Sequence, residues 1–226
     1  MKAQVIKGKT KSDATRGKIL DAALQLFRDQ GFEATTMREI AESAGVATGA
    51  AYYYFDSKDA IVLAFYDQAQ QEMAARMEDV LAGGKDLTER LQGILRVKLE
   101  YFEPSRRFLG ALSVHTDPNH PLSPFSAQTR EIRENDMRFF ERALEGSRVR
   151  VPDDLRAYLP RLLWMYQMGM ILFWINDRSA GQKKTQALIG KSLEVVVRLI
   201  KLASLPLTKP LRRMVIDLVD VVTEGA

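Results

Sequence analysis

The segment from Thr36 to Lys58 carries the side chains with the clearest binding chemistry in this 226-residue chain. Thr36, Tyr53 and Tyr54 offer hydroxyl groups, and Lys58 offers an ammonium group. Such groups donate hydrogen bonds to phosphate oxygens, and none of them forms a nucleophile–base pair with a neighbour in the sequence. Taken alone, such side chains also occur on ordinary solvated surfaces, so their role depends on the elements that carry them.

Two short helices joined by a tight turn at Gly45-Val46 are expected to position these groups. The first begins at Thr36, which forms a Thr-x-x-Glu capping box with Glu39, and the second covers about Thr48–Tyr54. This is helix-turn-helix spacing, in which the second helix enters the major groove, because a cylinder about 10–12 Å across fits a groove about 12 Å wide. A helical hairpin that does not bind DNA would have the same spacing, so the pattern leaves that alternative open.

Positive charge is concentrated at the N-terminus, although the formal net charge of the whole chain is only +4. Residues 1–18 contain six basic side chains and one acid, so this segment carries +5 and the rest of the chain −1. A basic arm before a near-neutral body favours phosphate contact by the N-terminus, with a solvated tail as the alternative.

The composition excludes several classes of protein and site. The chain has no cysteine, which rules out disulfides, thiol catalysis and cysteine-ligated metals, and suits a reducing cytoplasm. The longest nearly uncharged stretch, Leu162–Asn176, is shorter than the roughly 20 residues that span a bilayer. We therefore expect a cytoplasmic protein without a membrane partner.

Catalytic and metal sites are not indicated either. His115 and His120 are the only histidines, and no second cluster supplies further ligands at helical spacing. Glycine-rich phosphate loops, nucleophile elbows and paired-carboxylate motifs are absent from the sequence. We expect no metal, no cofactor and no enzymatic activity.

A series of motifs in fixed order occupies the first quarter of the chain. They are Thr15-Arg16, Ile19-Leu20-Asp21-Ala22-Ala23, Leu26-Phe27, Gly31-Phe32, Ala34-Thr35-Thr36, Arg38-Glu39-Ile40-Ala41, Ala44-Gly45-Val46, Gly49-Ala50 and Tyr52-Tyr53-Tyr54-Phe55-Asp56-Ser57-Lys58. From about Thr15 to Phe65 the sequence resembles the DNA-binding domain of the tetracycline-repressor family of bacterial transcriptional regulators. The resemblance implies a larger helical domain beyond it, which dimerises through its last long helices and encloses a small-molecule pocket.

The resemblance also implies DNA-contacting residues. Contacts to phosphates are expected from Thr36, Tyr53, Tyr54 and Lys58, and contacts to base edges from Thr48, Gly49 and Ala50. Tyr52 is expected to face the core, and Gly45 to have a structural role. The chain departs from the family pattern at Ala47, where a capping Ser or Thr is usual, although Thr48 could cap a helix that starts one residue later. Ala51 also stands where leucine is common.

Apolar residues at three- and four-residue spacing predict helices almost throughout the chain, so the expected fold is all-α. The expected domains are a flexible basic arm (residues 1–14), the helix-turn-helix domain (15–56) and a helical effector-binding and dimerisation domain (57–226). Beyond the first three helices we expect helices from Asp56-Ser57 toward Leu81 and over Leu87–Phe102, Arg106–His115, Pro124–Leu144, Asp153–Asn176, Gln182–Leu205 and Leu211–Glu224. Pro160 should kink or restart the helix that contains it.

Aromatic, methionine and amide side chains gather in the second domain. The predicted ligand pocket consists of Phe102, Phe108, Leu112, Phe139, Phe140, Trp164, Met165, Gln167, Met168 and Leu172, with an ordinary core as the alternative. The last long helices are apolar on nearly every side, which predicts a second subunit. The predicted dimer interface is Leu193, Val196, Val197 and Ile200, with Val196 and Ile200 facing the partner.

These features together predict a homodimeric transcriptional regulator, most simply a repressor. It would bind a palindromic double-stranded DNA operator and be released by a small apolar effector, with the helix that begins near Ser57 linking the two domains. One alternative is an architectural or division-control DNA-binding protein with a protein partner. Another is an enzyme or carrier built in the helical domain.

Overall fold

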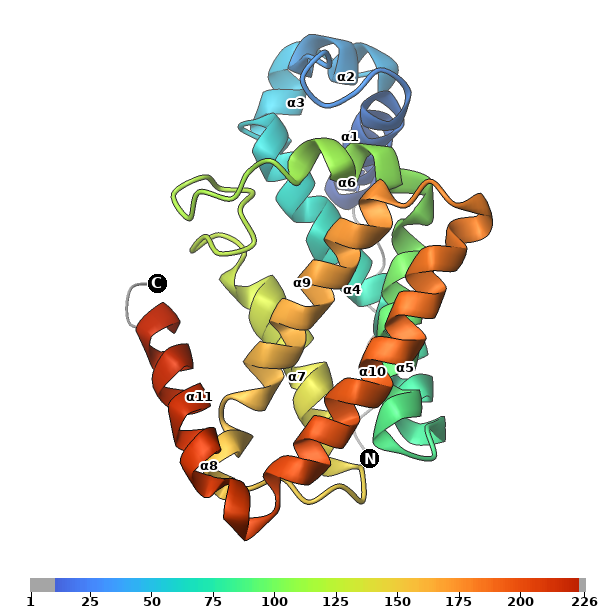
Figure 1. Ribbon diagram of the computed structural model, residues 1–226. Helices are drawn as coiled ribbons and strands as arrows, with labels where there is room; N and C mark the ends of the chain where they lie inside the picture. Colours follow the sequence, from blue (N-terminus) through green and yellow to red (C-terminus); the bar gives the residue numbers. More distant parts are fainter. Residues whose placement is uncertain (1–10, 224–226) are drawn as a thin grey trace, which may run out of the picture. The chain divides into compact units, whose positions relative to one another are not determined.

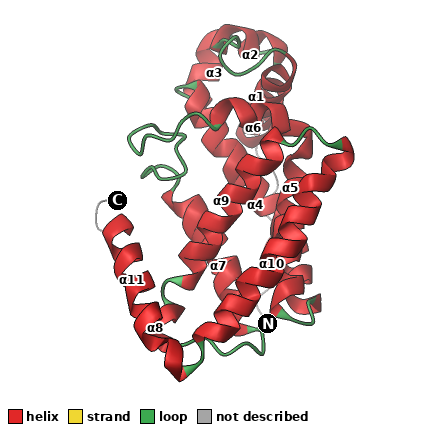
Figure 2. Ribbon diagram, viewed as in Figure 1, coloured by secondary structure: helices red, strands yellow, loops and turns green. Residues whose placement is uncertain are grey.

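The computed structural model describes residues 11–223, which form eleven α-helices and three short 3-10 helices without a β-strand in that range (Figures 1 and 2). The chain divides into two compact units, Met1–Tyr66 and Asp67–Ala226. The boundary lies within helix α4 (Lys58–Gly83), about ten residues beyond the expected one. No described helix has the length and apolar character needed to cross a membrane.

The first unit contains α1 (Lys11–Asp29), α2 (Met37–Ser43), α3 (Thr48–Tyr54) and the start of α4. Ile19, Ala23 and Phe27 of α1 are buried, as their spacing predicts, and Gly31 has the left-handed φ of 96° that ends such a helix. Helix α1 begins at Lys11, so the last four residues of the expected 1–14 arm are helical. The rest of that arm, residues 1–10, lies outside the described residues.

The second unit is built from the rest of α4 and from α5 (Leu87–Phe102), α6 (Arg106–Leu112), α7 (Arg130–Glu145), α8 (Asp153–Arg156), α9 (Leu159–Asn176), α10 (Lys183–Ala203) and α11 (Lys209–Thr223). Helix α7 packs along α9, and α5 packs along α10. The core combines apolar residues of most of these helices, with Met77, Ile94, Phe140 and Leu193 among the most deeply buried. Helix α5 has the predicted bounds because its apolar face is continuous from Leu87 onward.

Helices α4 and α5 meet at a close contact. Gly93 of α5 lies against Val80 of α4, and a Cβ atom on Gly93 would be only 2.5 Å from Val80 Cγ1. Real Cβ atoms do not approach a neighbour so closely, so a side chain at this position would push the helices apart. The glycine therefore sets the separation of the two helices.

Helix α7 begins at Arg130, so the predicted start at Pro124 is wrong. The hydroxyl of Thr129 donates to the carbonyl of Ser123 at 2.7 Å, and Arg133 Nη1 donates to the carbonyl of Pro124 at 2.6 Å. These side chains satisfy backbone carbonyls that a helix would otherwise use, which favours a turn-rich loop. The preceding helix, α6, likewise ends at Leu112 rather than His115.

The predicted helix Asp153–Asn176 is two helices, because the chain restarts at Leu159 with Pro160 in the first turn of α9. Proline is favoured there, since a first-turn residue needs no N–H partner within the helix. This confirms the predicted restart. The other bounds differ by a few residues at most, apart from the loop before α7.

Asp177 joins α9 to α10. Its Oδ1 accepts hydrogen bonds from the backbone N–H and hydroxyl of Ser179, and its Oδ2 accepts from those of Thr185. The bonds from Thr185 and then Ser179 hold the pKa of Asp177 well below the ordinary aspartate value. The carboxylate therefore stabilises the folded state at neutral pH.

We expect Asp177→Asn to lower the melting temperature at pH 7, because an amide cannot accept all four bonds at two anionic oxygens. A depressed pKa gives stability that is complete above the unfolded-state value, about 3.9. It is lost as the pH falls through the folded-state value. Melting curves from pH 7 to pH 2 should show the difference between wild type and variant narrowing below about pH 4. A gap that stays constant over this range would contradict the assignment.

Candidate nucleic-acid interface and effector domain

Thr36 caps helix α2 in the predicted manner. Its hydroxyl oxygen accepts from the backbone N–H of Glu39 at 3.2 Å, and its backbone N–H donates to Glu39 Oε2 at 2.8 Å. The hydroxyl also donates to Glu39 Oε2 at 2.8 Å, and these bonds hold the pKa of Glu39 below its usual value. The capping box is confirmed, whereas the contact of Thr36 with a phosphate stays a prediction.

The turn between α2 and α3 has the expected geometry. Gly45 adopts a left-handed φ of 68°, and the backbone N–H of Val46 donates to the carbonyl of Ala41 at 2.9 Å. Most residues avoid such a φ because of the Cβ atom, so glycine suits this position. The structural role predicted for Gly45 is thereby explained.

Helix α3 opens with Thr48 and Gly49, which are exposed, and with Ala50, which is half-buried. Ala47 is the N-cap residue and supplies no side-chain bond. Thr48 is inside the helix rather than capping it, so the alternative of a later start is wrong. Short side chains at the exposed start of α3 leave room for close approach by another molecule.

The three tyrosines of α3 do not all lie as predicted. Ala51 is fully buried and Phe55 nearly so, whereas the side chains of Tyr52 and Tyr53 are 52% and 83% exposed. The prediction that Tyr52 faces the core is wrong, because each helical residue turns by about 100° and Ala51 takes the inward position. The hydroxyl of Tyr54 accepts from Ser12 Oγ at 3.3 Å.

Lys58 is engaged within the first unit. Its Nζ donates to the carbonyl of Phe32 at 2.6 Å and lies 4.5 Å from the centre of the Phe32 ring. The ammonium group thus holds the first turn of α4 to the segment that follows α1. Sequence reasoning missed this contact, because nothing local marks a pair 26 residues apart. The predicted phosphate contact would use a remaining N–H.

The residues of the predicted ligand pocket lie in different environments. Five are buried, namely Phe108, Leu112, Phe140, Trp164 and Gln167. Phe102, Phe139 and Met168 are half-buried, and Met165 and Leu172 are exposed. None of the ten lines either of the two grooves described next. Met165 and Leu172 are therefore corrected to surface residues, while a pocket formed by the others stays a prediction.

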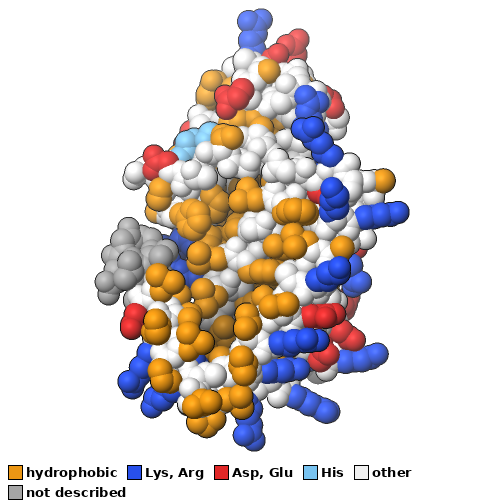
Figure 3. All heavy atoms as spheres, viewed as in Figure 1, with side chains coloured by type: hydrophobic (Ala, Val, Ile, Leu, Met, Phe, Trp, Pro, Cys, Tyr) orange, Lys and Arg blue, Asp and Glu red, His pale blue; other side chains and the backbone are white. Residues whose placement is uncertain are grey.

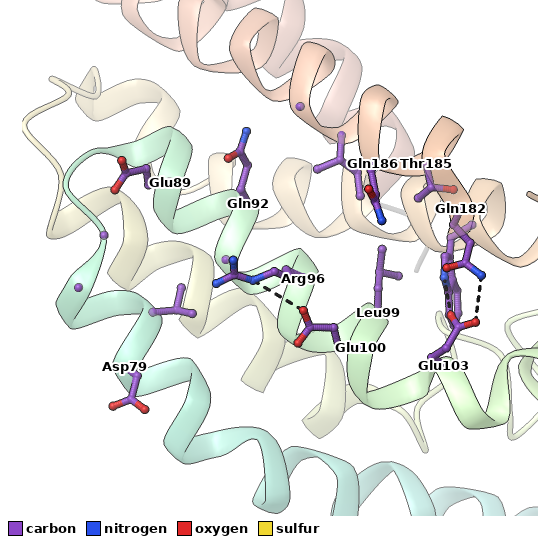
Figure 4. A pocket seen from close by; sticks show the side chains of 17 residues that line it. Asp79, Glu89, Gln92, Arg96, Leu99, Glu100, Glu103, Gln182, Thr185 and Gln186 are labelled. Carbon is purple, nitrogen blue, oxygen red and sulfur yellow. Dashed lines mark hydrogen bonds and ion pairs between the residues drawn. The ribbon is translucent and has the colours of Figure 1, made fainter. Parts of the chain in front are cut away.

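A polar groove of about 890 Å³ runs between α5 and the first half of α10, with the end of α4 at its margin (Figure 4). Its charged lining residues are Asp79, Glu89, Arg96, Glu100 and Glu103. Glu103 accepts hydrogen bonds from Trp174 Nε1 at 3.2 Å and from Gln182 Nε2 at 3.0 Å. Several of these carboxylates therefore already have partners on the same chain.

An apolar groove of about 350 Å³ lies among α8, α9, α10 and α11. Leu199 and Leu202 of α10 and Leu211 of α11 are exposed along it. Figure 3 shows that hydrophobic side chains gather on the face of the molecule that carries these helices. Large exposed apolar patches of this kind are typical of protein–protein contacts.

The predicted dimer residues need correction. Leu193, Val197 and Ile200 are buried in the core of their own subunit, and Val196 is half-buried. The prediction that Ile200 faces a partner is wrong, because the apolar strip of α10 that points outward is rotated by about one residue. That strip contains Val195, Leu199 and Leu202, which are half or more exposed.

Comparison with known proteins gives two family matches. Residues 19–65 match the family described as "Bacterial regulatory proteins, tetR family". Residues 90–221, more than half of the chain, match "Tetracyclin repressor-like, C-terminal domain". The first match ends one residue before the last residue of the first unit, Tyr66, and the second match begins within α5.

Curated relatives are transcriptional regulators. The transcriptional repressor KstR2 of Rhodococcus jostii is 29% identical over 102 residues, 45% of this chain and 48% of that protein. The regulator UidR of Escherichia coli K12 is 30% identical over 93 residues, 41% of this chain and 47% of that protein. In these alignments the chain spans about half the length of the curated relatives it matches.

Solved structures share the fold over most of both chains. FadR of Thermus thermophilus, a repressor solved with lauroyl-CoA, is 26% identical, with a TM-score of 0.57, 84% of this chain covered and 95% of that chain. FadR of Bacillus subtilis, solved with stearoyl-CoA, is 19% identical, with a TM-score of 0.62, 80% of this chain covered and 97% of that chain. Because its sequence identity is only 19%, the similarity to the B. subtilis protein concerns the fold alone.

The unfilled cap of α3 gives a stability prediction. Ala47→Ser should raise the free energy of unfolding by about 0.5–1 kcal/mol, because a serine hydroxyl can accept from the first turn of the helix. Thr36→Ala should lower it by about 1 kcal/mol through loss of the cap of α2. Urea unfolding of both variants would measure the two changes. If Ala47→Ser left the free energy of unfolding unchanged, the backbone N–H groups in the first turn of α3 would already have hydrogen-bond partners.

Proposed function

Because this chain belongs to the tetR family of bacterial regulatory proteins, we propose that it is a transcriptional repressor that binds a palindromic operator as a homodimer and is released by a small molecule bound in its second unit. The observation that carries the proposal is the exposed start of α3 in a helix-turn-helix whose first helix is capped by Thr36. A helix presented in this way can enter the major groove of DNA.

Base recognition is assigned to the start of α3. Thr48 and Gly49 are exposed and short, and Ala50 offers a methyl group, so the backbone can approach base edges and thymine methyl groups closely. The buried Ala51 and Phe55 fix the rotation of the helix on its unit. Thr48 and Gly49 therefore point outward, with Ala50 at the edge of the exposed surface.

Phosphate contacts are assigned to the flanking groups. Tyr53 is strongly exposed, and the hydroxyl of Tyr54 accepts a hydrogen bond from Ser12, which leaves its own proton for a phosphate oxygen. Thr36 lies at the start of α2, where backbone N–H groups favour an anion. Lys58 Nζ donates to the carbonyls of Phe32 and Glu33, and its third N–H remains for a phosphate oxygen.

Dimerisation is assigned to the apolar strip of α10 with the neighbouring exposed side chains of α9 and α11. Phe173 of α9, Leu199 of α10 and Met214 of α11 are all at least 40% exposed. A two-fold dimer buries the same patch on both subunits, and it presents two copies of α3 to half-sites about 34–36 Å apart or a multiple of that spacing.

The effector is assigned to the second unit and to a molecule with a large apolar part. Support comes from the T. thermophilus FadR, which was solved with lauroyl-CoA and is 26% identical. Release of DNA then needs an effector that prefers one of two dimer states, with a coupling free energy of roughly 1–3 kcal/mol. The alternatives of an architectural protein or a helical carrier have no comparable support among the relatives.

The DNA-binding assignment is tested by selecting bound sequences from a random duplex library and then measuring the affinity of the protein for the preferred duplex. Tyr54→Phe and Lys58→Ala should weaken all sequences about equally, whereas Thr48→Ala and Ala50→Ser should change the preferred bases. Melting curves control for the fold, since Lys58 also holds α4. If Lys58→Ala changed the preferred bases while Thr48→Ala and Ala50→Ser did not, the assignment of α3 to the major groove would be wrong.

The N-terminal arm is tested through the salt dependence of DNA binding. Deletion of residues 1–10 removes three lysines, and each lost phosphate contact should reduce the log–log salt slope by about 0.9. Lys11 is retained, because it lies in α1. An unchanged slope and affinity would show that these residues do not contact the DNA.

The dimer surface is tested with Val195→Glu combined with Leu199→Glu. Both side chains are more than half exposed, so the subunit should keep its fold while the dimer loses an apolar strip and gains buried charge. Sedimentation equilibrium should show monomers, and operator affinity should fall by at least tenfold, because each half-site supplies part of the binding free energy. Lys201→Glu, on another side of α10, is the control. If the double variant remained dimeric, the interface would have to be assigned to another surface of the protein.

A further inference from the structure

A charged pair is buried in the core of the second unit. The side chains of Lys98 on α5 and Asp136 on α7 are less than a tenth exposed, and Lys98 Nζ donates to both carboxylate oxygens at 2.6 Å. Burial of two charges costs desolvation free energy that close geometry only partly offsets. A pair of this kind therefore needs an explanation beyond stability.

Two amides complete the cluster. Gln167 of α9 donates from Nε2 to Asp136 Oδ2 at 3.0 Å. Gln70 of α4 donates to the carbonyl of Ile132 at 2.8 Å and, more weakly, to Asp136 Oδ1 at 3.4 Å. Asp136 thus receives hydrogen bonds from side chains of α4, α5 and α9.

The cluster has one acceptor that nothing on the described chain satisfies. Gln167 is 0% exposed, and its Oε1 has no hydrogen-bond partner. Exchanging the positions of Oε1 and Nε2 in the amide would not give Oε1 a donor, because Oε1 would then face the carboxylate of Asp136. Buried polar atoms are nearly always paired, so an orphaned oxygen inside a domain marks a place where a donor is expected.

The neighbouring charges decide which donor fits. Lys98 Nζ and Gln167 Nε2 bond to the same oxygen of Asp136, at 2.6 Å and 3.0 Å, so the amide of Gln167 lies near an ammonium ion. A cationic donor would be repelled by Lys98, and a carboxylate has no proton to donate to Oε1. A neutral hydroxyl can donate to Oε1 and brings no further charge next to the buried ion pair.

We propose that Lys98, Asp136 and Gln167 form the polar recognition site for the effector, and that the effector is a neutral hydroxyl-bearing molecule with an apolar body. This inference rests on the proposed function. The surrounding core is suited to such a body, because Trp164 and Phe140 belong to it and the half-buried Met168 packs against it. Methionine side chains are flexible and can repack around an apolar guest.

Occupation of this site would reach α4 directly. A ligand hydroxyl bound to Gln167 Oε1 acts on the amide that donates to Asp136, and Gln70 of α4 shares that carboxylate. Asn135 Nδ2 also donates to Gln70 Oε1 at 2.7 Å, so Gln70 is held on both sides of its amide. Through this cluster a ligand can alter the hold of α7 on α4.

The test compares 1-decanol with decyl methyl ether, which shares the alkyl chain and the oxygen but has no proton to donate. The chain has two tryptophans, so the Trp174→Phe background leaves Trp164, one helical turn from Gln167, as the fluorescent reporter. We expect 1-decanol to bind about tenfold more tightly than the ether, as one additional buried hydrogen bond implies. Decylamine and decanoate should both bind more weakly than 1-decanol.

Gln167→Met should remove the preference for the alcohol and leave binding of the ether unchanged. Gln92→Met is the matched control, because Gln92 lines the polar groove rather than the cluster, and it should keep the preference. Equal binding of alcohol and ether by the wild type, binding of neither, or loss of the preference in Gln92→Met would each overturn the proposal. The comparison of the probes on the wild type holds even if Gln167→Met does not fold.

These measurements contain no DNA, so they separate this proposal from the function on which it rests. Binding of 1-decanol with the expected preference, together with unchanged operator affinity, would contradict release by this ligand and keep the binding site. Failure to bind any operator would contradict the repressor function itself.

Discussion

The ion pair between Lys98 and Asp136 is the interaction on which the arrangement of the second unit depends most directly. Apolar side chains drive the helices together, but their contacts are not directional and tolerate sliding. A buried ammonium and carboxylate tolerate neither sliding nor rotation, because a displaced charge would lose its partner inside a medium that solvates it poorly. Helices α4, α5, α7 and α9 are therefore fixed in register by one polar centre.

The first unit is organised by shorter-range bonds. Its helices α2 and α3 have seven residues each, too few to be stable alone, so their positions depend on caps and on the few side chains that reach the core. Thr36 and Glu39 fix the start of α2, while Ala51 and Phe55 anchor α3. Only a small part of α3 is needed for these inward contacts, so most of the helix surface is free to contact another molecule. A helix of seven residues can therefore present an outward face that includes two exposed tyrosines.

Much of the fold could be predicted from the sequence, since helix periodicity, glycine stops and the capping box at Thr36 are local signals. The bounds of α3 and α5 were predicted on that basis. The rotation of a helix about its axis is not local, which explains why Tyr52 and Ile200 were placed on the wrong side. The start of α7 was missed because Thr129 and Arg133 bond to distant carbonyls. Lys98 was missed as well, although a lone charge on the apolar face of α5 was a readable signal.

The contact between Gly93 and Val80 limits how the second unit can change shape. With so little space between α4 and α5, one helix cannot slip along the other without Val80 meeting the backbone of α5. Within the second unit, α4 and α5 therefore keep a fixed separation at this contact. A rearrangement of the second unit that displaces α5 at Gly93 therefore has to displace the adjoining turn of α4 as well.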